Sequence, residues 1–244
     1  MTAARRPGGS LAARPTRGIA ACAMVALGLV AGCATRAVPA ALPASRVAYL
    51  HAVEALAALQ SLNVELLTND SATQTLERWC AAHRLADPAR IVADRDRSVD
   101  KPATAAQRER LGVDATERIG YRRVKLRCGD MVLSEADNWY VPSRLTPAMN
   151  EALDTSDVAF GRAVQALGFV RERLGSELLW HPLPAGWDVG PRPAAATDAA
   201  PPAIPAHLLR HAAVLKLPDG RPISLVDETY TAAVLASLRQ RTGD

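Results

Sequence analysis

The sequence lacks the features that mark several large classes of protein. Seventeen prolines and 15 glycines among 244 residues are too few for a disordered or fibrous chain, and hydrophobic residues make up 49%. At least one globular domain is therefore expected. The motifs of dinucleotide-binding proteins, P-loop nucleotide hydrolases, zinc proteases and serine hydrolases are also absent. We accordingly expect neither a cofactor nor a metal.

The chain also lacks a basic excess in its main part. The formal net charge is +4, but residues 1–32 contain four arginines and no acid. From Cys33 onward there are 25 basic and 25 acidic side chains. This balance excludes a strongly basic binding face inferred from overall charge, and we expect no nucleic-acid partner.

The N-terminal apolar run is short. Residues 18–31 form an uncharged run of 14 residues, whereas a helix that spans a bilayer needs about 20. The run follows an arginine-bearing segment, which is the layout of a secretory signal. It ends in Leu-Val-Ala-Gly-Cys at residues 29–33, which resembles the bacterial lipobox. The resemblance implies a signal peptide over 1–32 and lipidation of Cys33, followed by a tether over 33–45.

The lipobox resemblance also implies a location. Ala34 follows the cysteine, and a residue other than aspartate there implies sorting to the outer membrane, on the periplasmic face. Acyl chains contribute about 0.8 kcal/mol per buried methylene, so more than one chain anchors a protein stably. We therefore expect the membrane to be a partner, through the lipid on Cys33.

Cysteine is scarce in the mature chain. Of the four cysteines, Cys22 leaves with the signal and Cys33 carries lipid, so Cys80 and Cys128 remain. In an oxidising compartment two remaining cysteines are candidates for one disulfide. Two separately buried thiols are the alternative.

Hydrophobic spacing predicts helices and strands in an order typical of an α+β fold. Apolar residues recur at helical spacing over 45–66, and Ser71 followed by Gln74 resembles a capping box that opens a second helix. Shorter helices are expected over 146–153 and 160–167. Strands are expected over 89–97, 121–128, 131–141, 169–180, 210–217 and 223–231. The sequence thus predicts a single antiparallel β-sheet with helices packed on one face.

These elements define the expected domain organisation. One domain is expected over 46–232, interrupted by a proline-rich insertion or flap over 182–205 and followed by a tail over 233–244. His207 and His211 are four residues apart at the entry to a predicted strand, with no third ligand nearby. We interpret both as surface histidines.

Four motifs in a fixed order are the most specific feature. An arginine-bearing strand runs into a hairpin over 121–130, and a strand closes in Val-Pro over 133–142. A helix begins at 160–162, and Gly-Arg-Pro at 220–222 precedes a strand that carries two acids. Together with Asp-Ser-Ala-Thr at 70–73, this order resembles the chorismate lyase family, which converts chorismate to 4-hydroxybenzoate and pyruvate. It is also similar to the ligand-sensing domains of some bacterial repressors.

The resemblance implies an arginine and an acid that hold the ligand. An alignment without gaps places the arginine at Arg123, but strand alternation favours Arg122, which shares a face with apolar residues. The same kind of alignment places the acid at Asp227, while the chemistry favours Glu228. A guanidinium suits a carboxylate ligand, and a carboxyl group could orient a ring hydroxyl and move a proton. Both pairs stay open at this point.

Three further residues match positions that border the family's pocket, namely Ala72, Phe160 and Gly161. Three functions are compatible with these features. The first is an exported lipoprotein that binds a small aromatic or carboxylate molecule. The second is a chorismate pyruvate-lyase, and the third is a structural envelope lipoprotein. The binding and enzyme hypotheses predict a closed cavity with one inward arginine.

Overall fold

A computed structural model describes residues 44–190 and 203–241. The expected signal peptide, the lipidation site Cys33 and most of the expected tether lie outside the described residues. So does the middle of the proline-rich segment. Among the described helices, none is long and apolar enough to cross a membrane.

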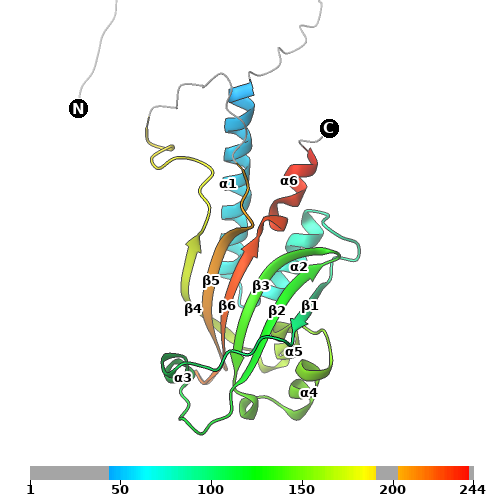
Figure 1. The fold of residues 1–244 in the computed structure, drawn as a ribbon, viewed down its shortest axis with the longest axis vertical. Helices are drawn as coiled ribbons and strands as arrows, with labels where there is room; N and C mark the ends of the chain where they lie inside the picture. Colours follow the sequence, from blue (N-terminus) through cyan, green and yellow to red (C-terminus); the bar gives the residue numbers. More distant parts are fainter. Residues whose placement is uncertain (1–43, 191–202, 242–244) are drawn as a thin grey trace, which may run out of the picture. The chain divides into compact units, whose positions relative to one another are not determined.

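The fold is built on one antiparallel sheet of six strands in the order β1-β2-β3-β6-β5-β4 (Figure 1). Strands β1–β3 form one meander and β4–β6 another, and pairing of β3 with β6 joins the two. The predicted α+β class with a single antiparallel sheet is confirmed. The strands are β1 Ile91–Asp96, β2 Gly120–Cys128, β3 Met131–Tyr140, β4 Val170–Leu178, β5 His207–Lys216 and β6 Pro222–Thr231.

Two helices, α1 Ala44–Thr68 and α2 Ala72–Ala82, cover one face of the sheet, which we term the inner face (Figure 1). Leucines of both helices are fully buried in one cluster with apolar residues that alternate along β1 and β2 and with others from β3, β5 and β6. Helix α2 begins at Ser71, whose hydroxyl accepts a hydrogen bond from the backbone N–H of Gln74 at 3.3 Å. The predicted capping position is therefore confirmed. Helices α4 Pro147–Thr155 and α5 Phe160–Ala163 lie at one end of the same face.

A third short helix, α3 Ala105–Leu111, packs on the opposite, outer face. Leu111 is fully buried in a cluster with Trp139, Val214 and Leu225. The prediction that the helices pack on one face is therefore wrong for α3. This helix shields an apolar patch on the outer face of the sheet from water. The helix begins with a complete capping box between Thr104 and Gln107.

A disulfide joins Cys80 of α2 to Cys128 at the end of β2. The expected pairing is therefore present in the structure. Both cysteines are fully buried in the main core, and the bond ties the helix that covers the inner face to the sheet beneath it.

The first part of the segment expected as a C-terminal tail belongs to the packed domain. Residues Ala232–Leu235 form a 3₁₀ helix that leads into α6 Ala236–Arg241. Val234 and Leu235 are buried in the main core, and the indole N–H of Trp79 donates to the carbonyl of Val234 at 3.0 Å. The domain therefore continues beyond residue 232, because these apolar side chains complete its core.

Candidate functional site

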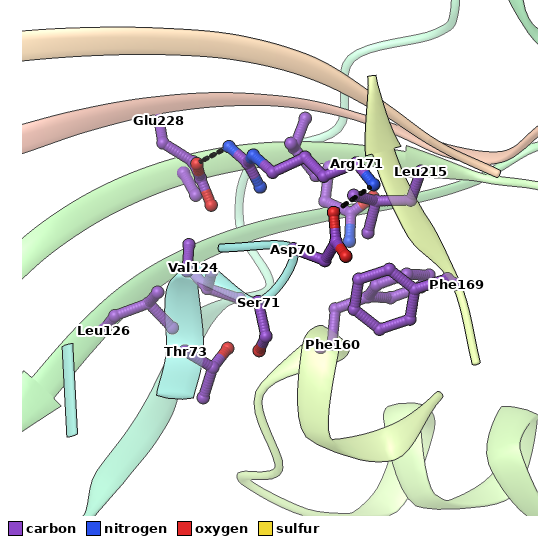
Figure 2. A pocket seen from close by; sticks show the side chains of 15 residues that line it. Asp70, Ser71, Thr73, Val124, Leu126, Phe160, Phe169, Arg171, Leu215 and Glu228 are labelled. Carbon is purple, nitrogen blue, oxygen red and sulfur yellow. Dashed lines mark hydrogen bonds and ion pairs between the residues drawn. The ribbon is translucent and has the colours of Figure 1, made fainter. Parts of the chain in front are cut away.

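A cavity of about 40 Å³ lies between the inner face of the sheet and the N-terminal ends of α2 and α5 (Figure 2). Its lining combines apolar side chains with a few polar groups. Strands of both meanders contribute to it, together with the turn between α1 and α2. Of the residues predicted from the sequence, Ala72, Phe160, Gly161 and Glu228 line this cavity.

A buried ion pair forms the polar side of the cavity. The guanidinium of Arg171 on β4 pairs with the carboxylate of Glu228 on β6, and the two side chains are only 3% and 7% exposed. The hydroxyl of Tyr230 donates to Glu228 Oε2 at 3.1 Å. Burial alone would lower the pKa of Arg171, but the neighbouring Glu228 carboxylate raises it above its ordinary value. Arg171 therefore stays cationic, and its Nε is buried without a hydrogen-bond partner.

The opposite side of the cavity is the start of α2. Ser71 and Thr73 line it, and Thr73 is buried although its hydroxyl makes no hydrogen bond among the described residues. Gly161 of α5 lies against both hydroxyls. A Cβ atom at Gly161 would stand 3.1 Å from Ser71 Oγ and 3.2 Å from Thr73 Oγ1. Glycine at this position lets α5 approach α2 closely.

Asp70, in the turn before α2, also lines the cavity, and its Oδ1 accepts the backbone N–H of Arg171. The last polar residue of the lining is Asn138 of β3. Its Oδ1 accepts a hydrogen bond from Ser224 Oγ, which directs the amide NH₂ elsewhere. This NH₂ has no acceptor in the described part of the chain, although Asn138 is 3% exposed and lines the cavity. Donors from Asn138, Arg171 and Thr73 thus surround one small space without acceptors of their own.

Arg122 is the inward arginine of the predicted pair. It is 1% exposed, and its Nη2 donates to the carbonyl of Val158 at 3.1 Å. Among the described residues it forms no ion pair, and its Nε has no partner. Burial, followed by the nearby charge of Arg95, lowers its pKa to about 10, so it remains charged at neutral pH. It does not line the cavity, but Asn138, its cross-strand partner, does.

The other two candidates face away from the cavity. Arg123 lies on the outer face, where it pairs with Glu135 at 3.1 Å and with Asp137 at 3.2 Å. Asp227 also lies there and pairs with Arg210. Successive strand residues point to opposite faces, so the structure places Arg122 and Glu228 inward and Arg123 and Asp227 outward.

Ala72, Phe160 and Gly161 all line the cavity, as the resemblance implies. Phe160 packs against Tyr140 with ring centroids 5.6 Å apart. The cavity of about 40 Å³ has room for very few water molecules, whereas benzene fits an engineered cavity of about 150 Å³. An aromatic ligand would therefore have to displace a lining side chain such as Phe160 or Phe169.

His211 differs from its expected exposure. It is 1% exposed on β5, and its Nε2 lies 2.8 Å from Asn63 Oδ1 and 3.0 Å from Ser176 Oγ. The surface interpretation is wrong for this residue because it faces α1 across the inner side of the sheet. Burial lowers its pKa to about 4. Within the described ranges, no group of three side chains could hold a metal ion.

Sequence reasoning missed Arg171, Asn138 and Thr73 as cavity residues. Thr73 lay within the recognised Asp-Ser-Ala-Thr motif, and Asn138 lay in a predicted strand. The alternation of β4 is broken by an irregularity between Arg173 and Gly175, so the pattern gave no indication of which face Arg171 occupies.

No family model matches the chain. Among solved structures, it is similar to the effector domain of PhnF from Mycobacterium smegmatis, with 15% identity and a TM-score of 0.41, over 67% of this chain and 89% of that one. It is also similar to YydK from Bacillus subtilis, named as a possible transcriptional regulator, with 17% identity and a TM-score of 0.36. That match covers 57% of each chain, so this protein spans just over half the length of YydK.

Among curated proteins, the chain is similar to the uncharacterized protein y4mC of Sinorhizobium fredii. The two are 55% identical over 187 residues, which is 76% of this chain and 78% of the relative. Identity of this level over most of both chains means a shared fold and common descent. The chain belongs to the same family as y4mC.

Proposed function

We propose that this protein binds a small aromatic carboxylate in the cavity on the inner face of the sheet. The observation that carries the proposal is a set of donors around one cavity. Arg171 Nε is buried without a partner, and the Asn138 NH₂ and the Thr73 hydroxyl belong to residues that line the same cavity and have no acceptor among the described residues. A buried donor left without an acceptor costs about 1–3 kcal/mol. A ligand that brings acceptors removes this cost, so the cavity favours an acceptor-rich ligand.

The charges near the cavity support an anion. Arg122 is a buried cation without a carboxylate partner among the described residues, and its strand neighbour Val124 lines the cavity. Arg171 adds a second guanidinium with an unused Nε. A carboxylate accepts strong, charge-assisted hydrogen bonds from guanidinium groups. Its charge would also be attracted by Arg122 at longer range, because Arg122 lies on the same face of β2 as Val124 but does not line the cavity.

The walls support an aromatic or otherwise apolar body for the ligand. Phe160, Phe169, Leu215 and Leu126 line the cavity, and flat rings bury well against such side chains. Because the cavity of about 40 Å³ is smaller than a ring, ligand entry requires a lining side chain such as Phe160 to turn away from its present position. This view accords with the resemblance of the sequence to the chorismate lyase family.

The proposal includes the location. The apolar run and the Leu-Val-Ala-Gly-Cys motif at residues 29–33 favour export and a lipid anchor at Cys33. The protein would then hold its ligand at the periplasmic face of the outer membrane.

Isothermal titration of the purified protein with 4-hydroxybenzoate, chorismate and 4-hydroxybenzyl alcohol tests the binding. The two carboxylates should bind saturably, and the alcohol, which has no carboxylate, should bind weakly. A ligand at a hundredfold excess over its Kd should stabilise the fold by about 2.7 kcal/mol. If neither carboxylate binds, the proposal is wrong. Release of pyruvate from chorismate in the same mixture would instead identify a lyase.

A further inference from the structure

We propose that Arg171 determines the charge specificity of the cavity, because its ion pair with Glu228 makes the cavity accept anions and reject amines. This inference rests on the proposed binding function and concerns the same site. A cavity that contains a carboxylate would ordinarily attract a cation, whereas the proposed ligand is an anion.

Glu228 is the carboxylate that would repel an anionic ligand. It lies in the middle of β6, is 5% exposed and lines the cavity. A second carboxylate that enters beside an unpaired, buried Glu228 would be strongly repelled, because two like charges in one site cannot both ionise easily. The other acid of the lining, Asp70, is exposed to solvent, so its charge is screened. The cavity can therefore accept an anionic ligand only if the charge of the buried Glu228 is already neutralised.

Arg171 supplies this neutralisation from within the fold. Strand β5 lies between β4 and β6, so the long side chain of Arg171 crosses β5 to reach Glu228 (Figure 2). Its backbone N–H donates to Asp70 Oδ1 at 2.9 Å, which fixes the base of the side chain. Tyr230 holds the carboxylate from the other side. The pair is therefore positioned before any ligand arrives.

The pair also leaves a donor for the ligand. Arg171 contacts Glu228 through Nη2, while its Nε is buried and has no partner. The Arg171 guanidinium can thus neutralise Glu228 while Nε remains without an acceptor in the described part of the chain. A ligand carboxylate reaches this buried Nε once a lining side chain has moved aside. An amine would meet only a carboxylate whose charge is already balanced.

The test compares two ligands that share a ring, 4-hydroxybenzoate and 4-hydroxybenzylamine, by titration calorimetry. Arg171→Gln leaves Glu228 unpaired and should weaken binding of the acid at least about tenfold while it strengthens binding of the amine. Glu228→Gln leaves Arg171 unpaired and should strengthen binding of the acid. The double variant should lose the gain for the amine.

Arg173→Gln is the matched control, because Arg173 is exposed on the same strand and does not line the cavity. It should bind both ligands like the unaltered protein. If Arg171→Gln does not fold, the opposite shift in Glu228→Gln still tests the inference, and Arg171→Lys should retain the preference for the acid.

The outcomes separate the two proposals. If the unaltered protein binds 4-hydroxybenzoate, and both Arg171→Gln and Glu228→Gln bind the two ligands as it does, Arg171 does not set the specificity. If the unaltered protein binds no carboxylate, the proposed function fails. A gain of amine binding in Arg171→Gln would even then support the role of Arg171.

Discussion

Two buried arginines of this protein differ in how their charge is balanced. Arg171 has the carboxylate of Glu228, whereas Arg122 has only the carbonyl of Val158. Placing an unpaired ion in the interior costs several kcal/mol. Arg122 is therefore expected to serve binding at the expense of stability.

Replacement of Arg122 by methionine tests this view. The variant keeps much of the apolar stem but removes the uncompensated charge. We expect the free energy of unfolding without ligand to stay within about 1 kcal/mol of the unaltered value or to rise. The affinity for 4-hydroxybenzoate should fall about tenfold, because a cation near the cavity is lost. Urea unfolding and titration calorimetry measure the two effects. Arg123→Met, on the outer face, should leave affinity unchanged; equal losses at both positions would contradict the assignment.

Phe160 limits the size of the cavity. Phe160→Leu should enlarge it and increase the affinity for 4-hydroxybenzoate, at a cost of about 1 kcal/mol in the free energy of unfolding. Leu153→Val is a suitable control because Leu153 belongs to the same core cluster but does not line the cavity. It should lower stability by a similar amount without a change in affinity. A Phe160→Leu protein with unchanged affinity would show that the ring does not obstruct the ligand.

The buried His211 predicts a pH dependence of stability. Its pKa is lowered to about 4 in the folded protein and is about 6.5 in an unfolded chain. As pH falls below 6.5, the unfolded chain takes up the proton first, so stability declines between pH 6.5 and 4 and is unaffected by this residue above that range. The loss is about 1.4 kcal/mol per pH unit in the middle of the range.

Urea unfolding between pH 7.5 and 4.5 measures this effect. His211→Gln should show a flatter pH profile than the unaltered protein. His207→Gln should not differ from it, because the His207 side chain is 48% exposed. Identical profiles for all three proteins would mean that His211 is not held neutral.

For some residues the sequence predicts the face of the sheet on which the side chain lies, and for others it does not. Arg122 could be assigned to the inner face because it alternates with apolar residues, and Glu228 because a glutamate suits the chemistry. Arg171 could not be assigned, since most of β4 is exposed on both sides and its register is irregular after Arg173. Its partner lies 57 positions away, a relation that no local pattern contains.

At the scale of elements, the long periodic segments were predictable, and so were the short helices expected over 146–153 and 160–167, whereas α3 and α6 were missed. The helix expected over 45–66 and the six strands match the structure to within about three residues, because their burial pattern extends over many positions. Helix α3 has seven residues, too few for a periodic pattern, and only its capping box at Thr104 could have indicated it. The helical end of the chain was missed because its elements are short, a 3₁₀ helix of four residues followed by an α-helix of six.

The disulfide couples one helix to the sheet. It closes a loop between positions 48 apart, for which chain entropy gives a stabilisation of about 4 kcal/mol. The paired variant Cys80→Ala/Cys128→Ala should lose stability of this order in urea unfolding, and a reductant should lower the unaltered protein to a similar level. If the reductant leaves the stability unchanged, the two cysteines are not linked in solution.

At the scale of the whole molecule, the lipid anchor is the main proposal that depends on residues before the domain. Labelling cells with radioactive palmitate should label the protein, and Cys33→Ser should abolish the label. Cys22→Ser is the matched control, because Cys22 lies within the expected signal, and it should be labelled normally. Labelling of Cys33→Ser would contradict the anchor.

The seam between the two meanders runs beneath the cavity. Asn138 of β3 and Val226 of β6 pair directly across it, and both line the cavity. Neither half of the sheet contains a complete site. Two fragments made by cutting the chain between β3 and β4 should therefore bind no ligand separately. A ligand that contacts both fragments should stabilise their complex. Ligand binding would then show that the two halves of the sheet have associated. Binding could therefore be used to measure the assembly of the fold from its two fragments.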